Sequence, residues 1–237
     1  MNAWTDIFPC MRKSPVETPR EAEVRAIDVN NDGNPRNPDF SYLADNVELD
    51  IESSKRSTLE WYYRQYKKVE EEVKEAAQLV AMPFWFIAAI DMREMSFVHT
   101  GHFANGDKII GTGKKTYRIP RGLGPAETWA ESVEQAINYE ISISTTFSNY
   151  TGPDMKLFDA LIAWEAYNGL GFRYKGSYSE YVFGFTNFHN EKGRFVADGK
   201  YDPNSRVVRP GTAAFVLYLK EKGEIKGEEL WESSCEK

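Results

Sequence analysis

The stretch IAAIDMREMSF, residues 87–97, places a glutamate at the end of a run of core-forming residues. The apolar residues predict a helix over 84–92 that is buried nearly all round, and Pro83 fits its first turn. Glu94 follows Ile90 by four residues, so both lie on the same helix face. We therefore expect the carboxyl group of Glu94 to be held against apolar surface at the end of a central helix.

Composition restricts the class of protein. The 237 residues fit one domain, alone or with an appendage, and 41% hydrophobic and 27% charged residues predict a soluble globular chain. The net charge of −7 argues against a nucleic-acid partner. No apolar run approaches the ~18 residues of a membrane span. The 14% of aromatic residues indicate either a large aromatic core or rings that stack on sugars.

The two ends of the chain carry no pattern of secretion or cross-linking. Cys10 and Cys235 are too far apart in the sequence to suggest a disulfide framework or a metal cluster. The start, MNAWTDIFPCMRKSP, lacks the apolar segment and the cleavage pattern of a signal peptide. The sequence therefore predicts a protein made in the cytoplasm, which needs another route to any target outside the cell.

The chain divides into two predicted parts. Residues 1–54 keep no helical or strand period and predict an irregular N-terminal arm or appendage. Residues 55–237 predict one α+β domain that is mostly helical, with a small β-hairpin or sheet over the glycine-rich segment 99–122, directly after the central helix.

Apolar spacing and capping residues predict the other helices of this domain. Ser57 with Glu60, and Thr128 with Glu131, have the spacing of capping boxes, and this role explains Glu131 without any catalysis. The predicted helices cover Ser57–Val80, Thr128–Ile141, Asp154–Tyr167 and Gly211–Lys222.

Glu94 has the arrangement of a glycosidase acid, because it ends a buried helix and precedes a hairpin. Apolar surroundings raise the pKa of a carboxyl group. A carboxylic acid that stays protonated near neutral pH can protonate a glycosidic oxygen. The alternative is a structural ion pair with a lysine or arginine at the helix end.

Short motifs follow one another in a fixed order: REMSF (93–97), HFANGD (102–107), TYRIPRG (116–122), TWAES (128–132), EAYNGLGFR (165–173) and FVADGKYDP (195–203). Over about residues 75–222 this order resembles a lysozyme-family peptidoglycan hydrolase of phage or prophage type. The EAYNG stretch is also similar to a signature of lytic transglycosylases in the same superfamily.

The resemblance implies a lysozyme-like fold that cleaves the β-1,4 bond between N-acetylmuramic acid and N-acetylglucosamine, with no cofactor for catalysis. It makes Glu94 the catalytic acid and Asp107 the residue that positions water. Tyr167 and Asn168 would lie across the cleft, and Glu165 would be either a second site carboxylate or an anchor for this segment. The remaining implied substrate-binding residues are His102 and Asn105. Both histidines of this region, His99 and His102, are predicted as hydrogen-bonded loop residues rather than metal ligands.

Two other functions stay open beside this one. One is a lytic transglycosylase that uses Glu94 on the same substrate without a second carboxylate. The other is a non-catalytic phage structural or wall-binding protein with the same fold. The expected partners are peptidoglycan glycan strands and, through residues 1–54, phage particle proteins. The protein would act on the cell wall as a released endolysin or as part of a phage particle.

The stretch DVNNDGNPRNPD, residues 28–39, has the spacing of a calcium-binding loop. Its oxygen ligands would be Asp28, Asn30, Asp32 and Asp39, set around Gly33, and it is similar to a dockerin-type loop. The alternative is an ordinary turn rich in Asn and Asp. The sequence thus leaves open a structural calcium site in the N-terminal arm.

Overall fold

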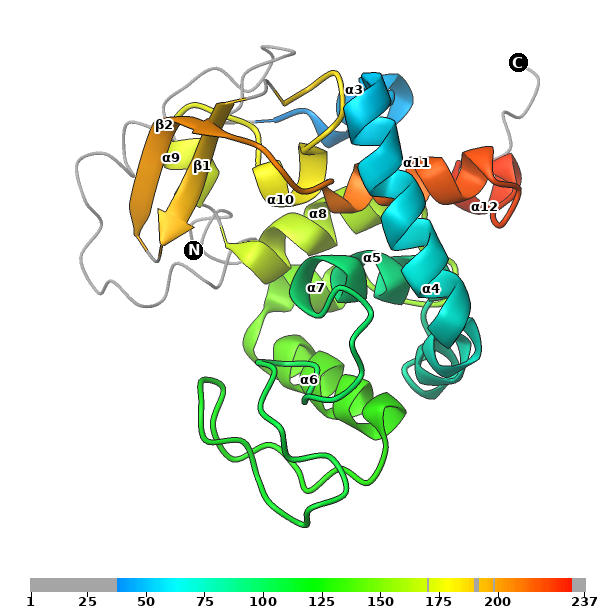
Figure 1. Ribbon diagram of the computed structural model, residues 1–237, viewed down its shortest axis with the longest axis vertical. Helices are drawn as coiled ribbons and strands as arrows, with labels where there is room; N and C mark the ends of the chain where they lie inside the picture. Colours follow the sequence, from blue (N-terminus) through cyan, green and yellow to red (C-terminus); the bar gives the residue numbers. More distant parts are fainter. Residues whose placement is uncertain (1–37, 170, 190–191, 198, 232–237) are drawn as a thin grey trace.

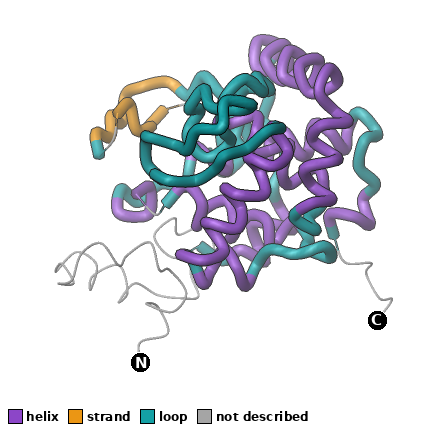
Figure 2. Tube along the Cα trace, turned by 90° about the horizontal axis from the view of Figure 1, so that it is seen from below, coloured by secondary structure: helices purple, strands orange, loops and turns teal. Residues whose placement is uncertain are grey.

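The protein is mostly helical. The computed structural model describes residues 38–169, 171–189, 192–197 and 199–231. Among them it places one sheet, of two antiparallel strands, beside a body of helices (Figures 1 and 2). The prediction of a mostly helical α+β chain is therefore confirmed.

The longest helix, α4 (Ser53–Leu79), carries the apolar stripe that its sequence predicts. Val69 and Val80 are partly buried against the core, and the remaining stripe residues are buried: Leu59, Tyr62, Tyr66, Val73 and Ala76. The predicted start at Ser57 is wrong, because Glu52 is the N-cap and the Ser57 hydroxyl instead donates to the carbonyl of Ser53 inside the helix.

Helix α5 (Phe84–Glu94) lies at the centre of the helical body (Figure 1). Each of its residues from Trp85 to Met92 is buried. It packs against α4 and α11 (Thr212–Glu221), and the ring of Phe86 stacks on Trp164 with 5.5 Å between centroids. The predicted central buried helix is thus present.

Helices α6 (Trp129–Ile143) and α8 (Leu157–Asn168) lie where the sequence predicts helices, with ends shifted by one to three residues. Thr128 caps α6 by accepting from the backbone N–H of Glu131, whose carboxylate accepts from the N–H of Glu127. Glu131 is therefore a capping residue. Helix α8 ends at Gly169, whose φ of 88° favours glycine.

The remaining helices are short. They are α3 (Phe40–Asn46), α7 (Thr145–Asn149), α9 (Gly171–Tyr174), α10 (Glu180–Phe183) and α12 (Gly227–Leu230). Among the described helices, no single one has the length and hydropathy to cross a membrane; α4 and α5 reach both only when joined across a 117° bend.

The N-terminal boundary predicted at residue 54 is wrong. Leu43 and Ala44 of α3 are buried in the main core, and α3 packs against α8. Leu49 then pairs with Thr186 in an antiparallel bridge. The folded domain therefore begins by residue 38, the first residue that the structure describes.

The predicted position of the β element is also wrong. Residues 98–127 contain turns and no strand, whereas the hairpin is formed by β1 (Lys192–Ala197) and β2 (Lys200–Arg206). Polar side chains such as Asp107 and Thr116 bind the backbone of the 98–127 loop, and these bonds replace a strand ladder. Figure 1 shows the hairpin and the loop at different ends of the molecule, with α8 between them.

The hairpin packs on α9 through aromatic rings. Phe195 of β1 contacts Phe172 with 5.0 Å between ring centroids. A Cβ added at Gly171 would lie 2.9 Å from the Phe195 ring, so a larger residue here would displace that ring. The EAYNGLGFR and FVADGKYDP motifs thus meet in space.

Candidate functional site

Glu94 is the last residue of α5 and its side chain is exposed. The expectation that its carboxyl group is held against apolar surface is wrong. The buried part of α5 ends at Met92, so the helix face that is covered at Ile90 reaches solvent at Glu94. A rigid helix therefore presents this carboxyl group to solvent.

The end of α5 is fixed by an arginine from a distant segment. Nη2 of Arg209 donates to the carbonyls of Met92 and Arg93, at 3.0 and 2.6 Å, and to Oγ of Ser96 at 3.1 Å. Ser96 and Phe97 then have φ of 52° and 61°. Non-glycine residues in this region are strained and occur at functional sites, where the surroundings hold them in place.

Two tyrosines lie beside Glu94. Burial raises the pKa of Tyr181 well above its usual value, and the charge of Glu94 raises it further. The pKa of Tyr167 is raised in the same way, by burial and then by the charges of Glu94 and Glu140. The two rings are 6.4 Å apart. The structure thus brings Tyr167 to Glu94, whereas Asn168 is exposed at the end of α8.

A pocket of about 510 Å³ opens next to this group. Its lining comes from the ends of α5 and α8, from α9 and α10, and from the hairpin. The side chains that line it include Arg93, Asn168, Phe172, Glu180, Tyr181 and Phe195.

Arg93 forms one wall of this pocket. Its Nη1 donates to Oε1 of Glu180 at 3.3 Å and to the carbonyl of Pro210 at 3.0 Å. Its guanidinium carbon lies 4.9 Å from the ring centroid of Tyr181. The sequence alone assigns no role to Arg93, Tyr181 or Glu180, because only the fold brings Arg93 to Glu180, 87 positions further along the chain.

Asp107 does not join this site. Its carboxylate is inaccessible, and Oδ2 accepts from the backbone N–H groups of Tyr117 at 2.8 Å and Arg118 at 3.0 Å. Burial alone would raise the pKa of Asp107, but these bonds and the charge of Arg118 hold it below its usual value. The predicted role in positioning water is therefore not supported, because this carboxylate holds the loop together.

His102 and Asn105 belong to the same loop, where His102 is buried and Asn105 is half-buried. His102 is fully buried, with Nε2 3.1 Å from Oε1 of Gln135. Burial lowers the pKa of His102. Asn105 donates to the carbonyls of Arg118 and Pro120 and accepts from the N–H of Asp107. Both residues therefore help to hold the loop. A substrate contact is not supported for His102, and for Asn105 it stays a prediction.

Glu165 is an anchor, as one of the two predicted alternatives states. Its side chain is 4% exposed and forms two hydrogen bonds with Arg173, from Nε at 3.0 Å and from Nη2 at 2.5 Å. The pair ties α8 to α9 and so fixes the segment that carries Tyr167. As this carboxylate is buried and paired, a contact to substrate is not supported.

His99 lies in a charge cluster, from buried Asp91 to exposed Glu72, that the sequence did not reveal. Its ring nitrogens lie 2.8 Å from Oδ2 of Asp91 and 2.7 Å from Oε2 of Glu72, and the ring stacks on Trp129 at 3.5 Å. The prediction of a hydrogen-bonded loop histidine is confirmed. Its partners come from α4, α5 and α6, so local spacing carries no signal for them.

Of the four predicted calcium ligands, only Asp39 lies among the described residues. Asp28, Asn30 and Asp32 lie outside the described residues. Oδ1 of Asp39 accepts from the N–H groups of Ser41 and Tyr42 and caps α3. Across the part of the chain that the structure describes, no group of three or more His, Cys, Asp or Glu could hold a metal ion.

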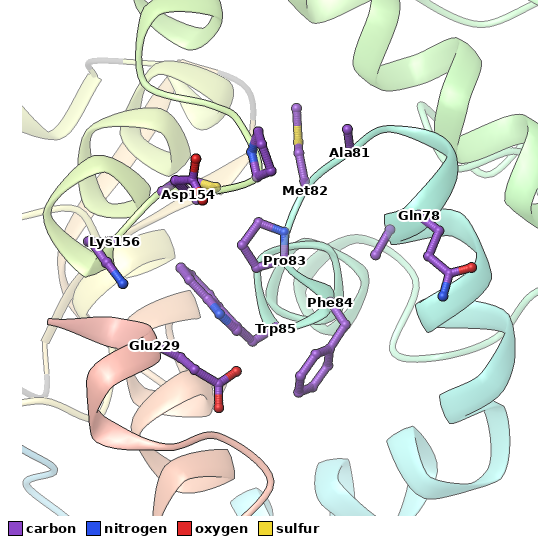
Figure 3. Close-up of a pocket in the computed structure, with 12 residues that line it drawn as sticks. Gln78, Ala81, Met82, Pro83, Phe84, Trp85, Asp154, Lys156 and Glu229 are labelled. Atoms are coloured by element: carbon purple, nitrogen blue, oxygen red, sulfur yellow. The ribbon is translucent and has the colours of Figure 1, made fainter. Parts of the chain in front are cut away.

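A second pocket, of about 400 Å³, lies at the other end of α5 (Figure 3). Met82, Pro83 and Trp85 line it from the α4–α5 bend, and Lys156 and Glu229 face it from the opposite side. It is far from Glu94, because α5 lies between the two pockets. The pocket beside Glu94 is therefore the better candidate for chemistry.

Comparisons with protein-family models, with curated proteins and with solved structures give no match for this chain. The functional argument therefore depends on the motifs and on the geometry around Glu94.

Proposed function

We propose that the protein is a peptidoglycan hydrolase with a lysozyme-like fold, which cleaves the β-1,4 bond between N-acetylmuramic acid and N-acetylglucosamine. Glu94 is its general acid. The observation that carries the proposal is the exposed carboxyl group of Glu94 at the end of an otherwise buried helix, beside Tyr167, Tyr181 and a pocket of about 510 Å³. The motifs around these residues support the same reading.

Cleavage of the glycosidic bond requires a proton at the glycosidic oxygen. A glycan strand bound over the end of α5 would cover Glu94 and remove water from it, which favours the protonated carboxyl group. Glu94 then donates its proton to the leaving oxygen as the bond from the muramic acid C1 breaks, and a water molecule bonds to C1 and loses a proton to solvent. The fixed end of α5 keeps the acid in place during this step.

A lytic transglycosylase is the second candidate, and the position of Asp107 favours it. Asp107 is buried within its loop and is not available to activate water. In the transglycosylase reaction the C6 hydroxyl of muramic acid attacks its own C1, the bond from C1 to the leaving oxygen breaks, and Glu94 protonates that oxygen. Glu94 then takes the hydroxyl proton, so neither water nor a second carboxylate is needed.

Glu94→Gln tests both candidates. It keeps the size of the side chain and removes the proton, so wall-clearing activity should fall ~10²–10⁴-fold with an unchanged circular dichroism spectrum. The control is Glu71→Gln on the exposed face of α4, where the side chain is 89% exposed, and it should clear walls at the parent rate. A fully active Glu94→Gln protein would contradict the proposal.

The products separate the two reactions. Hydrolysis leaves reducing muramic acid ends, whereas transglycosylation leaves 1,6-anhydro ends that are lighter by one water. We expect reducing ends in the mass spectrum of digested peptidoglycan. Anhydro ends would replace the hydrolase by the transglycosylase and leave the role of Glu94 unchanged.

A further inference from the structure

The tip of the 98–127 loop, residues 114–121, carries the most exposed large hydrophobic side chains among the described residues. Ile119 is 77% exposed and Tyr117 is 60% exposed, the two highest values of this kind. The side chain of Arg118, which separates them in the sequence, is 62% exposed. Single exposed apolar residues are common on protein surfaces, but two of them on one tip indicate a surface that contacts a partner.

The same loop is basic in an acidic protein. Residues 108–126 contain five lysine and arginine residues and no aspartate or glutamate, whereas the whole chain has a net charge of −7. All five occupy exposed positions: Lys108, Lys114, Lys115, Arg118 and Arg121. Asp107 balances part of the Arg118 charge, with Oδ1 3.4 Å from Nε, and the next acid along the chain is Glu127. Because physiological salt screens charges over ~8 Å, a partner at the tip meets this positive cluster rather than the negative charge of the whole chain.

Backbone hydrogen bonds hold the two arms of this loop side by side. The N–H of Gly111 donates to the carbonyl of Ala126 at 2.9 Å. Closer to the tip, Thr116 donates from its N–H to the carbonyl of Leu123 at 2.8 Å and accepts from the N–H of Gly122 at 3.0 Å. The loop extends beyond α6 at the lower end of the molecule in Figure 1, so its cations and its exposed apolar side chains gather at one projecting tip.

Two side chains of the HFANGD motif fix the tip from its inner side. Asp107 accepts from the N–H groups of Tyr117 and Arg118, and Asn105 donates to the carbonyls of Arg118 and Pro120. These bonds hold the backbone of the tip against the interior of the loop. The tip is therefore ordered before a partner binds, which lowers the entropic cost of binding.

An anionic lipid bilayer offers both kinds of contact that the tip needs. Its phosphate headgroups attract lysine and arginine side chains. Its interface accepts a tyrosine ring, which is apolar with a polar end, and the hydrocarbon below accepts an aliphatic side chain. A soluble polyanion would bind the cations but would leave Ile119 in water.

We propose that this tip docks on an anionic lipid bilayer, with Ile119 and Tyr117 inserted between the headgroups and with Lys114, Lys115 and Arg121 on the phosphates. The proposal goes beyond the proposed function, because the contact needs neither the catalytic acid nor a glycan. Docking by the tip holds the chain at a membrane through one preformed loop, without a membrane-spanning helix.

Co-sedimentation of the full chain with lipid vesicles tests the proposal. One set of vesicles is phosphatidylcholine alone, and the other contains phosphatidylglycerol as about one quarter of its lipid. We expect the partition coefficient to be at least ~10-fold higher on the anionic vesicles and to fall as salt rises from ~0.1 to ~0.5 M, since salt screens the attraction. Equal partition on both sets, or none on either, overturns the proposal.

The double variant Lys114→Gln with Lys115→Gln tests the charges. One cation near an anionic surface strengthens binding ~5-fold, so the loss of two should weaken partition on the anionic vesicles at least ~10-fold. The matched control is Lys67→Gln with Lys68→Gln, which removes another adjacent pair of exposed lysines, on α4, and should partition like the parent. An equal fall in both double variants would show attraction by overall charge and would overturn the assignment to the tip.

Ile119→Ser separates a bilayer from a soluble polyanion. It removes the apolar side chain without changing the charge, so partition on the anionic vesicles should fall about tenfold. The control is Val208→Ser, at a position that is 58% exposed and outside the loop, and it should partition like the parent. An Ile119→Ser protein that partitions like the parent overturns bilayer docking even where the lysine variant binds weakly, because a polyanion needs the charges alone. The measurement involves no cleavage, so its result is independent of the proposed function.

Discussion

The carboxylate of Asp107 forms its hydrogen bonds within its own loop. The two N–H groups that it binds lie ten and eleven positions further along the chain, at Tyr117 and Arg118. An ionised carboxylate is the stronger acceptor for such bonds. The sequence motif marks this residue as special, but the reason is the conformation of the loop between α5 and α6.

Asp107→Asn should therefore lower thermal stability. The amide is a weaker acceptor, so we expect the melting temperature to fall by several degrees at neutral pH. The control is Asp154→Asn at an exposed position, which should leave the melting temperature unchanged. The pKa of Asp107 is depressed on folding, so its contribution is complete above the unfolded value of ~3.9 and is lost as pH falls through the folded value. Parent and variant should thus converge only in acid. A large loss of activity with an unchanged melting temperature would return Asp107 to the site.

The buried pair of Glu165 and Arg173 gives a second prediction at this scale. Glu165→Gln replaces the carboxylate beside the buried Arg173 guanidinium with a neutral amide, and breaking a buried ion pair costs about 3–5 kcal/mol of unfolding free energy. Denaturation by urea measures it. Glu221→Gln removes the partner of Arg56 in an exposed pair and should cost little, because solvent screens that pair. Equal losses in both variants would show that burial is not the cause.

At the scale of elements, helices were predictable and the strands were not. The stripe of α4 and the all-round apolar surface of α5 follow from periods that local sequence carries. The hairpin of β1 and β2 contains Gly193 and Pro203, which interrupt the alternation of apolar and polar residues typical of a strand. The 98–127 loop, in contrast, has short β-like runs in its sequence, but hydrogen bonds from its own side chains hold them in turns.

The candidate site divides in the same way. Glu94 and Tyr167 could be found, because each stands in a motif at a predicted helix end. Tyr181 and Arg209 could not, because they reach Glu94 and the end of α5 only through long-range packing. Asp107 was misplaced because its motif does not reveal that the loop closes on its own carboxylate.

The contact of His99 with α4, α5 and α6 predicts a pH-dependent stability. Burial lowers the pKa of His99, but Asp91 of α5 and Glu72 of α4 raise it more, so the net shift is upward; α6 contributes the uncharged ring of Trp129. The stabilisation is therefore complete below the usual value of ~6.5 and is lost as pH rises through the folded value. His99→Gln should lose most stability near pH 6, and its deficit against the parent should shrink by pH 9 in urea titrations. A deficit that grows with pH would contradict the cluster.

At the scale of the molecule, segments from both ends of the described chain close the core. Nε1 of Trp231 donates to the carbonyl of Ala44 at 3.1 Å. Asn187 donates to the carbonyl of Asn46 and accepts from the N–H of Glu48. The segment 38–54 is thus joined to parts of the chain more than 130 residues away, and it belongs to the domain that carries Glu94.

A truncation series tests this assignment. A chain that begins at residue 38 keeps α3 and its contacts, and a chain that begins at residue 55 loses them. Leu43 is fully buried, and removing such a side chain alone costs about 2–5 kcal/mol. We expect the shorter chain to melt at a clearly lower temperature than the longer one and to lose wall-clearing activity with its fold. Leu43→Ala in the full chain should reproduce part of this loss, whereas Tyr42→Ala, at an exposed position of the same helix, should cost much less. Equal melting temperatures for the two truncated chains would place the start of the domain at residue 55 after all.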